Sequence, residues 1–240
     1  AIVKPATVTC FLTEAVVAAI HDSGILPPGA LQLVCGSARN ILDHVDERDV
    51  VTFTGSASTG IALKQHPRIS QHAVPFNMEA DSLNSAILGP DAVPGTPEFD
   101  LFVKEVRKEM TVKCGQKCTA VRRVFVPAAV QEEFQAALMA QLHKTQVGDP
   151  QKEGVRMGAL VGKAQVQDVL DQVARLEQEA EWLFGQDKKA DVLADNPERG
   201  AFLPAMLLKH ANPHEATAVH EVEAFGPVST VMPYHDVEEA

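Results

Sequence analysis

The sequence has few cysteines, fewer basic than acidic side chains and no long apolar run. Four cysteines in 240 residues are too few for a disulfide framework, and no secretory signal pattern is present, so we expect a cytoplasmic protein. Lys and Arg number 21 against 32 Asp and Glu, a net charge of −11. This balance argues against nucleic-acid or anionic-membrane partners, because phosphate binding needs clustered cations. No stretch approaches the roughly 18 apolar residues of a transmembrane helix.

Metal-ligand spacing is also lacking. Cys114 and Cys118 are spaced Cys-x3-Cys, and no second Cys/His pair nearby completes a zinc site. His210, His214 and His220 are loosely spaced in a segment that contains Pro and Asn, where solvated loop histidines are expected. We therefore predict no metal site.

Strand-like and helix-like segments alternate, which predicts an α/β fold with a mostly parallel sheet. Short apolar runs predict strands at 31–35, 50–53, 73–80, 85–88 and 121–126, with further strands towards residue 232. Helices are expected at 8–22, from GSASTG to Lys64, after Thr96-Pro97, at about 128–144 and at about 162–180. In the third helix, Thr96 would be the N-cap and Pro97 the first helical residue. Its apolar face would consist of Phe99, Phe102, Val103, Val106 and Met110.

The stretch 89–100 is rich in Pro, Gly and Asp, which predicts a hinge between two lobes. The lobes would be residues 1–88 and residues 89–240. This boundary separates the first group of predicted strands from the helix that follows Pro97.

Cys118 is a candidate nucleophile. It follows a predicted helix in the segment GQKCTA, next to Lys117, and neighbouring cations favour the reactive thiolate form. Gly115 removes side-chain obstruction to an approaching substrate. The alternative is an ordinary buried thiol, because Cys is among the most buried residue types. The segment by itself leaves both interpretations open.

Other candidate groups lie at predicted strand ends and in a turn. In FTGSASTG, a strand that runs through Gly55 and Ser56 into a helix exposes N–H groups suited to a phosphate. The segment is neither GxGxxG nor a Walker loop, and such a connection needs glycine anyway. Glu79 ends an apolar strand and is either a general base or a solvated strand end. Glu223 precedes a Gly-Pro turn and by itself indicates only an acidic loop.

Taken in order, these segments resemble the NAD(P)-dependent aldehyde dehydrogenases. Seven family motifs are in register over essentially the whole chain: Lys4-Pro5-Ala6, Phe53-Thr54-Gly55-Ser56, Glu79, Gly115-Gln116-Lys117-Cys118, Val147-Gly148-Asp149-Pro150, Gly200-Ala201-Phe202-Leu203-Pro204 and Glu223-Ala224-Phe225-Gly226-Pro227-Val228. The implied fold is aldehyde dehydrogenase-like. Residues 1–88 would be part of a Rossmann-like cofactor lobe and residues 89–240 an α/β catalytic lobe, so the chain is expected to come from the middle of a longer enzyme.

The resemblance implies aldehyde oxidation by covalent catalysis. Cys118 would attack the aldehyde carbon as a thiolate to form a thiohemiacetal, and hydride transfer would leave a thioester. Glu79 would then activate the water that hydrolyses it. The Cys118 N–H would be one oxyanion donor, whereas the family's second donor, an Asn side chain, is expected upstream of this chain. The motifs imply cofactor contacts from Lys4, Ala6, Thr7, Gly55, Ser56, Glu223 and Phe225.

NADP is the expected cofactor, with NAD as the other candidate. NAD-preferring relatives often carry Glu directly after K-P-A, where this chain has Thr7. Without that carboxylate a 2′-phosphate meets no like charge, and Lys4 offers it a cation.

The segment at the glutamate departs from the usual family pattern. Most relatives have E-L-G-G-K where this chain has Glu79-Ala80-Asp81-Ser82-Leu83. The strings PFNMEADSLN and KCGQKCTAVRRVFVP resemble the dehydrogenases for CoA-linked semialdehydes of aerobic phenylacetate and benzoyl-CoA degradation. The expected partner is therefore a small aldehyde linked to CoA, and a homo-oligomer is expected of the full-length protein. A fused hydratase domain, present in one such relative, has no counterpart in this sequence.

Three alternatives remain open at this stage. In an acylating member of the family, CoA rather than water would release the acyl group, although Glu79 favours hydrolysis. The chain could also be a binding-only remnant that retains the fold without the chemistry. Finally, Cys114 could form an inactivating disulfide with Cys118 or be a bystander thiol.

Overall fold

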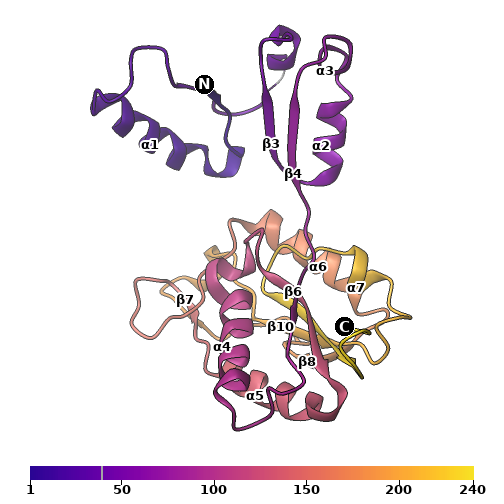
Figure 1. Cartoon of the computed structure of the whole chain (residues 1–240). Coiled ribbons are helices and arrows are strands. Elements are labelled where there is room, and N and C mark those ends of the chain that lie inside the picture. Colours follow the sequence, from indigo (N-terminus) through magenta and orange to yellow (C-terminus); the bar gives the residue numbers. More distant parts are fainter. Residues whose placement is uncertain (39) are drawn as a thin grey trace. The chain divides into compact units, whose positions relative to one another are not determined.

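Strands and helices alternate through the whole chain, as the sequence predicts (Figure 1). The computed structural model describes residues 1–38 and 40–240. By its internal contacts the chain divides into two units, Ala1–Asp81 and Ser82–Ala240.

The first unit contains two parallel strand pairs, and helical segments connect the strands of each pair. Its strands and α-helices are β1 (Ile2–Val3), α1 (Cys10–Asp22), β2 (Gln32–Leu33), β3 (Val51–Gly55), α2 (Ala57–Lys64), α3 (Pro67–Gln71) and β4 (Phe76–Ala80). Short 3-10 turns span Thr7–Thr9 and Ile41–His44. β1 pairs with β2 and β3 with β4, so that Thr54 lies opposite Glu79.

The second unit is built on a five-stranded sheet in the order β5-β6-β11-β10-β8. Its elements are β5 (Asn84–Ile87), α4 (Pro97–Thr111), β6 (Val121–Pro127), α5 (Gln131–His143), β7 (Val147–Gly148), α6 (Lys163–Leu176), β8 (Glu181–Phe184), β9 (Val192–Leu193), β10 (Met206–Lys209), α7 (Ala218–Glu221) and β11 (Val228–Tyr234). Short 3-10 turns span Val112–Gly115, Ala128–Val130 and Pro197–Arg199. The sheet is parallel except for the edge strand β8, which confirms the predicted mostly parallel α/β arrangement.

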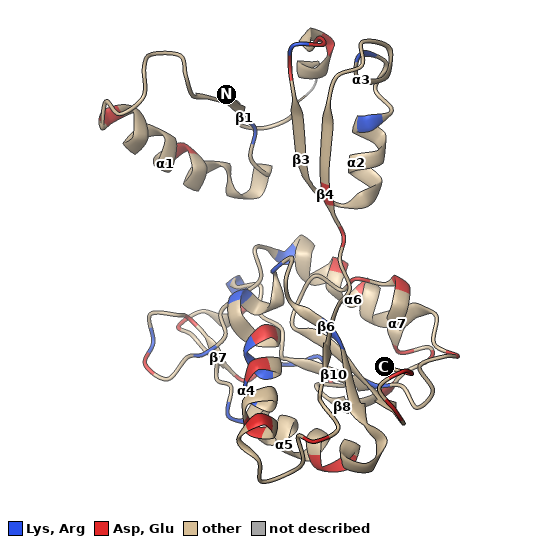
Figure 2. Ribbon diagram, in the orientation of Figure 1, with Lys and Arg blue, Asp and Glu red and all other residues tan. Residues whose placement is uncertain are grey.

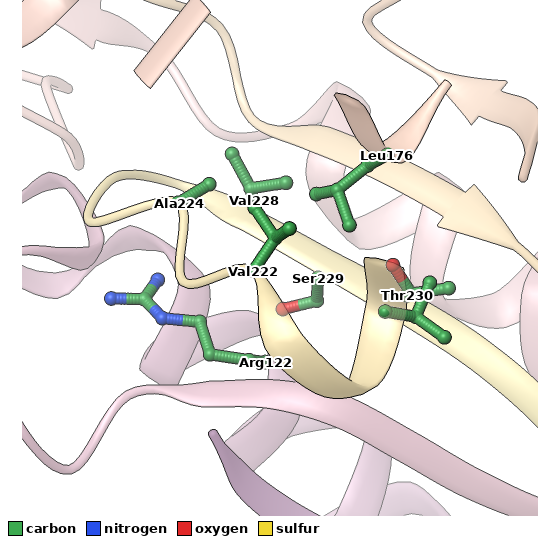
Figure 3. Close-up of a pocket in the computed structure, with 8 residues that line it drawn as sticks. Arg122, Leu176, Val222, Ala224, Val228, Ser229 and Thr230 are labelled. Carbon is green, nitrogen blue, oxygen red and sulfur yellow. The ribbon is translucent and has the colours of Figure 1, made fainter. Parts of the chain in front are cut away.

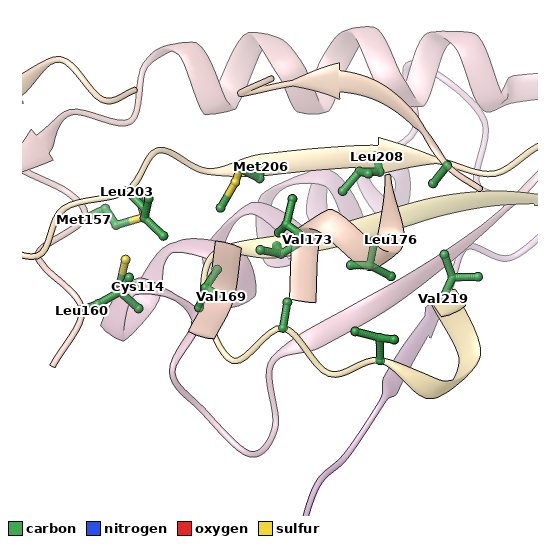
Figure 4. Packing of buried hydrophobic residues seen from close by; sticks show 14 of the residues in the cluster. Cys114, Met157, Leu160, Val169, Val173, Leu176, Leu203, Met206, Leu208 and Val219 are labelled. Atoms are coloured by element: carbon green, nitrogen blue, oxygen red, sulfur yellow. The ribbon is translucent and has the colours of Figure 1, made fainter. Parts of the chain in front are cut away.

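Two apolar clusters fill the second unit. One joins α4 and α5 to the sheet and includes Phe99, Val103, Val106, Met110, Phe134, Leu138, Val124 and Val231. The other joins α6 to the sheet and includes Val169, Val173, Leu176, Met206, Leu208 and Met232 (Figure 4). Burying a side chain of this size stabilises the folded state by about 1.5–3 kcal/mol, so the clusters hold the sheet against its helices.

The predicted start of α4 is confirmed. Thr96 is its N-cap, and its side-chain oxygen accepts a hydrogen bond from the Phe99 N–H at 3.3 Å. Pro97 occupies the first helical position, where its missing N–H costs nothing. The predicted apolar face is buried, with Phe102 partly so.

Some boundaries differ from those that the sequence predicts. The division between units falls after Asp81 rather than after residue 88, because β5 pairs with β6 and joins the sheet of the second unit. Leu88, next to the predicted hinge, and Ala92, within it, are both buried in the α4–α5 cluster. α6 ends at Leu176 instead of near residue 180. The short helices α3 and α7 were not predicted, because a single turn shows no periodicity.

Charges of both signs are interspersed on the helices. α4 carries both acidic and basic side chains (Figure 2), and Lys108 pairs with Glu105 at 2.8 Å. Within residues 1–38 and 40–240, none of the helices is long and apolar enough to cross a membrane.

Candidate active site

Three loops of the second unit meet at one edge of its sheet. They precede β5, β6 and β11, which are neighbouring parallel strands, so the amino ends of these strands lie at the same edge. The loop before β6 carries Cys118, and the loop before β11 carries Glu223 and Phe225. The fold thus brings together three of the predicted site residues that are far apart in sequence.

Cys118 is exposed in a turn that follows a strained stretch of backbone. Lys113 and Cys114 adopt positive φ angles of 53° and 54°, and Gly115 continues with a φ of 68°. For a residue with a Cβ this conformation costs roughly 1–2 kcal/mol. Such strain persists only where surrounding contacts impose it, and it concentrates at functional sites.

The Cys118 carbonyl is held from the β5 side. The Ser82 hydroxyl donates to it at 2.6 Å, and the Asn84 side-chain amide donates to it at 2.7 Å. The same amide also donates to the Ala120 carbonyl at 3.1 Å. The Cys118 N–H forms no hydrogen bond with any residue that the structure describes. The turn is therefore immobilised through carbonyl oxygens while one N–H donor stays open beside the exposed thiol.

Lys117, the cation that the sequence places beside Cys118, is engaged elsewhere. Its ammonium group lies 2.6 and 2.7 Å from the two carboxylate oxygens of Glu109 on α4. Both side chains are mostly buried. The ion pair ties the Cys118 turn to α4, so the positive charge of Lys117 is largely compensated.

Cys114 is a buried thiol. It is fully shielded from solvent among Met157, Leu160 and Leu203 (Figure 4). Burial raises its pKa to about 12, which keeps it protonated and unreactive at neutral pH. All four cysteines are free thiols in the structure, which favours the bystander interpretation of Cys114 over the disulfide.

Gly115 lies directly against Gly226 of the loop before β11. A Cβ atom on Gly115 would overlap the Gly226 carbonyl and lie 2.9 Å from the Pro227 Cα. Substrate access is the role predicted for this glycine, and the structure adds that the two main chains are in contact here. With its positive φ, the position excludes any side chain.

Arg122, at the start of β6, joins the same two loops. Its side chain is only 5% exposed; one terminal nitrogen donates to the Gly226 carbonyl at 2.6 Å and the other to the Gly115 carbonyl at 2.7 Å. The guanidinium also lies 5.6 Å from the centre of the Phe225 ring. Burial lowers the pKa of Arg122, and the negative charge of Glu223 opposes this shift. Arg122 remains charged at any physiological pH, so a buried cation links the two loops.

A cavity of about 10 Å³ lies next to Arg122 and is lined by Val222, Ala224 and Ser229 among others (Figure 3). A space of this size holds at most about one water molecule. It is therefore a packing gap beneath the loop and not a substrate site. Figure 3 shows the Arg122 side chain extending from β6 towards the loop that carries Ala224.

In the first unit, Gly55 and Ser56 connect β3 to α2 as predicted. Ser56 caps α2, and its hydroxyl accepts a hydrogen bond from the Thr59 N–H at 3.4 Å. The Asp81 carboxylate accepts the Ala57 N–H at 3.1 Å and so lies at the end of the helix where a phosphate is expected. Gly55 contacts the Phe53 ring so closely that an added Cβ atom would clash.

The remaining predicted residues of the first unit are exposed or half-buried. Lys4 is exposed, and its ammonium group donates to the Pro5 carbonyl at 2.7 Å. Ala6 and Thr7 are exposed at the start of a 3-10 turn that leads into α1. Glu79 is exposed on β4. It belongs to the first unit, whereas Cys118 belongs to the second.

Each of the three histidines considered as metal ligands has a protein partner. His210 accepts the Asn212 N–H at 3.2 Å, and His214 lies 3.0 Å from the Glu239 carboxylate. The His220 ring lies between the Arg123 guanidinium at 3.1 Å and the Pro213 carbonyl at 2.9 Å. His210 and His214 lie in loops as predicted, whereas His220 is half-buried in the short helix α7.

Four residues with structural roles at the predicted phosphate site or beside Cys118 were not predicted from the sequence: Asp81 at the former, and Ser82, Asn84 and Arg122 at the latter. For Asp81 and Ser82 a signal existed, because they replace the two glycines of the usual family segment. For Arg122 the signal was a charged residue within a predicted buried strand, which calls for a partner.

The chain resembles known proteins along its full length. Residues 1–240 match the aldehyde dehydrogenase family. The chain is 50% identical to a 3,4-dehydroadipyl-CoA semialdehyde dehydrogenase of Aromatoleum evansii, over 99% of this chain and 46% of that protein. It therefore spans about half the length of the curated relatives that it matches.

Solved structures agree on the fold. The chain is similar to betaine aldehyde dehydrogenase of Staphylococcus aureus in complex with NAD+, with a TM-score of 0.85, 22% identity and coverage of 99% of this chain and 46% of that one. It is also similar to an aldehyde dehydrogenase of Bartonella henselae, with a TM-score of 0.80, 23% identity and coverage of 99% and 48%.

The exposure of the two loop thiols predicts selective alkylation. Iodoacetamide at neutral pH is expected to modify Cys118 at least about tenfold faster than Cys114, because only Cys118 is exposed and Cys114 stays protonated. A quenched time course followed by peptide mass spectrometry measures both rates. Cys118→Ser should abolish the fast alkylation of the peptide that contains residues 114 and 118, whereas Cys114→Ser should leave it unchanged. Faster modification of Cys114 would contradict the assignment.

Proposed function

This chain belongs to the aldehyde dehydrogenase family, and we propose that it carries the cysteine nucleophile of an enzyme that oxidises an aldehyde to the carboxylic acid with NAD(P). The observation that carries the proposal is the environment of Cys118. Its thiol is exposed in an immobilised turn that follows a strained stretch of backbone, with an open N–H beside it. A rigid thiol next to an uncommitted donor suits attack on a carbonyl carbon and stabilisation of the oxyanion that forms.

In the proposed reaction the Cys118 thiolate forms a carbon–sulfur bond with the aldehyde carbon. The carbonyl electron pair moves to oxygen, which the Cys118 N–H stabilises; one such donor contributes about 10²–10³ in rate. A bound nicotinamide supplies the acceptor for the hydride that leaves this carbon. Glu79 takes a proton from water, whose oxygen attacks the resulting thioester. The carbon–sulfur bond then breaks, and the thiolate of Cys118 is regenerated.

The residues present fit a dinucleotide. The N-terminus of α2 with Ser56 suits a pyrophosphate, and the exposed ammonium group of Lys4 suits a phosphate or ribose hydroxyls. Glu223 and Phe225 would hold the nicotinamide riboside. The Asp81 carboxylate at the N-terminus of α2 is negatively charged, as a phosphate bound there would be. It would therefore repel the phosphate unless its side chain turns away when the cofactor binds.

The substrate is proposed to be a CoA-linked semialdehyde from aromatic-acid catabolism. This rests on the 50% identity to the semialdehyde dehydrogenase of Aromatoleum evansii and on the strings around Glu79 and Cys118. A cytoplasmic location and a homo-oligomeric full-length protein are part of the same proposal. The location rests on the sparse cysteines, and the oligomeric state rests on the family resemblance.

The role of Glu79 tests the hydrolytic mechanism. Glu79→Gln in the whole enzyme is expected to leave a burst of one reduced nicotinamide per site, because attack and hydride transfer do not need this base. Steady turnover is expected to fall about 10²-fold or more, because thioester hydrolysis needs this base. Stopped-flow absorbance at 340 nm measures both phases.

Glu14→Gln is the matched control, since Glu14 is an exposed carboxylate on α1 of the same unit. It should retain both phases. Unchanged steady turnover in Glu79→Gln would refute the role of Glu79, and recovery of turnover on adding CoA would favour the acylating alternative. A wild-type enzyme that forms no reduced nicotinamide from the aldehyde would refute aldehyde oxidation itself.

The absence of an acidic residue at position 7 predicts a preference for NADP. The ratio of kcat/KM for NADP to that for NAD is expected to exceed one in the native enzyme. Thr7→Glu is expected to lower this ratio about tenfold or more, because it places a carboxylate beside the 2′-phosphate. Steady-state kinetics with each cofactor measures the ratio, and a native preference for NAD would overturn the prediction.

Asp81 is expected to weaken cofactor binding. Asp81→Asn keeps an oxygen to accept the Ala57 N–H but removes the negative charge from the N-terminus of α2. The cofactor Kd should fall about two- to fivefold, in line with the roughly 0.3–1 kcal/mol of a charge at a helix end. Quenching of intrinsic fluorescence or calorimetry measures the Kd. Asp22→Asn, at the exposed end of α1, is the control and should leave it unchanged.

A further inference from the structure

Arg122 holds two loops together at a cost that packing alone does not explain. Its guanidinium is almost entirely buried, and burying a cation is unfavourable before its partners are counted. An apolar side chain of similar volume would fill the same space without that cost. The guanidinium therefore has a specific task, and its contacts show what the task is.

Both partners of Arg122 are turn carbonyls that already accept a hydrogen bond. The Gly115 carbonyl accepts the Lys117 N–H at 2.9 Å, and the Gly226 carbonyl accepts the Val228 N–H at 2.9 Å. With the two Arg122 bonds, each oxygen uses both of its lone pairs. The planar fork of an arginine fixes the spacing of two such oxygens, whereas the point charge of a lysine does not.

One of the two turns leads to Cys118, and the other follows Glu223 and Phe225. The guanidinium lies against the Phe225 ring, and the charge of Glu223 acts on it. The side-chain hydrogen bonds and the ring contact of Arg122 thus run, among the described residues, to the predicted nucleophile loop or to the predicted nicotinamide loop. The adjacent Arg123 instead donates to the Leu83 carbonyl, in the loop before β5, and contacts the His220 ring.

We propose that Arg122 is a positioning residue that sets the separation between the Cys118 loop and the Glu223–Phe225 loop. The catalytic consequence of this proposal rests on the proposed function. In that function, the separation of the loops determines how far the thiol-bound carbon lies from the nicotinamide during hydride transfer. A displacement of about 1 Å between reacting groups costs about 10²-fold in rate. Arg122 itself touches neither substrate nor cofactor in this scheme.

The first arm of the test measures the loops without using activity. Amide hydrogen exchange in the whole protein is followed for peptides covering 112–118 and 223–226 in Arg122→Lys and in Arg175→Lys, a control at an exposed arginine of α6. Exchange is expected to accelerate about tenfold or more in both peptides of Arg122→Lys and in neither peptide of the control. Unchanged exchange in Arg122→Lys, or an equal increase in Arg175→Lys, would overturn the proposal.

The second arm measures hydride transfer with hexanal and NADP in a stopped-flow instrument. The rate of NADPH formation in the first turnover of Arg122→Lys is expected to fall about 10- to 100-fold, with a larger primary isotope effect from hexanal deuterated at C1, while Arg175→Lys changes by less than about threefold. An unchanged rate in Arg122→Lys would overturn the proposal. If the wild-type enzyme forms no NADPH from hexanal, the proposed function fails with this aldehyde, and the exchange data alone decide the role of Arg122.

Arg122→Met separates positioning from folding. Methionine fills much of the same volume and removes the buried charge, so the thermal midpoint is expected to stay within a few degrees of the wild type. The rate of NADPH formation in the first turnover should still fall as in Arg122→Lys. An unchanged rate in a folded Arg122→Met protein would show that the guanidinium has no positioning role.

Discussion

The close approach of Gly115 to Gly226 is the constraint on which the candidate site depends. No side chain separates the two loops, so their main chains touch, and the Arg122 guanidinium bridges the two carbonyls. On the opposite side, Ser82 and Asn84 hold the Cys118 carbonyl. The thiol is thus positioned by backbone contacts from three segments that are distant in sequence, and the strained residues before it are kept in place by those contacts.

The parallel sheet makes this convergence possible. β5, β6 and β11 are neighbours that run in the same direction, so the loops before them reach one edge. Ligands of open α/β sheets more often bind at the carboxyl ends of strands. Here the nucleophile loop and its supports gather at the amino ends. The apolar faces of α4 and α6, which are buried against the sheet, provide the rigid background that precise loop placement requires.

Much of the local structure was readable from the sequence. Helical spacing and the Thr96-Pro97 pair predicted α4 correctly, because caps and apolar faces are properties of a few consecutive residues. Motif order indicated the family, which the match over residues 1–240 confirms. The predicted lobe boundary differed from the division after Asp81, since Pro and Gly content reports turns and not which sheet a strand joins. The roles of Cys118 and Glu79 stay predictions, as do those of the cofactor residues.

The sequence by itself determined the periodicity of the elements, the family and the residue types able to carry the chemistry. Only the tertiary structure decided that Cys114 is buried and Cys118 exposed, although only three residues lie between them. It likewise decided that Lys117 pairs with Glu109 and that Arg122 reaches Gly226, 104 residues away. The physical reason is that burial and hydrogen-bond partners depend on which segments the sheet brings together. No local pattern records that pairing.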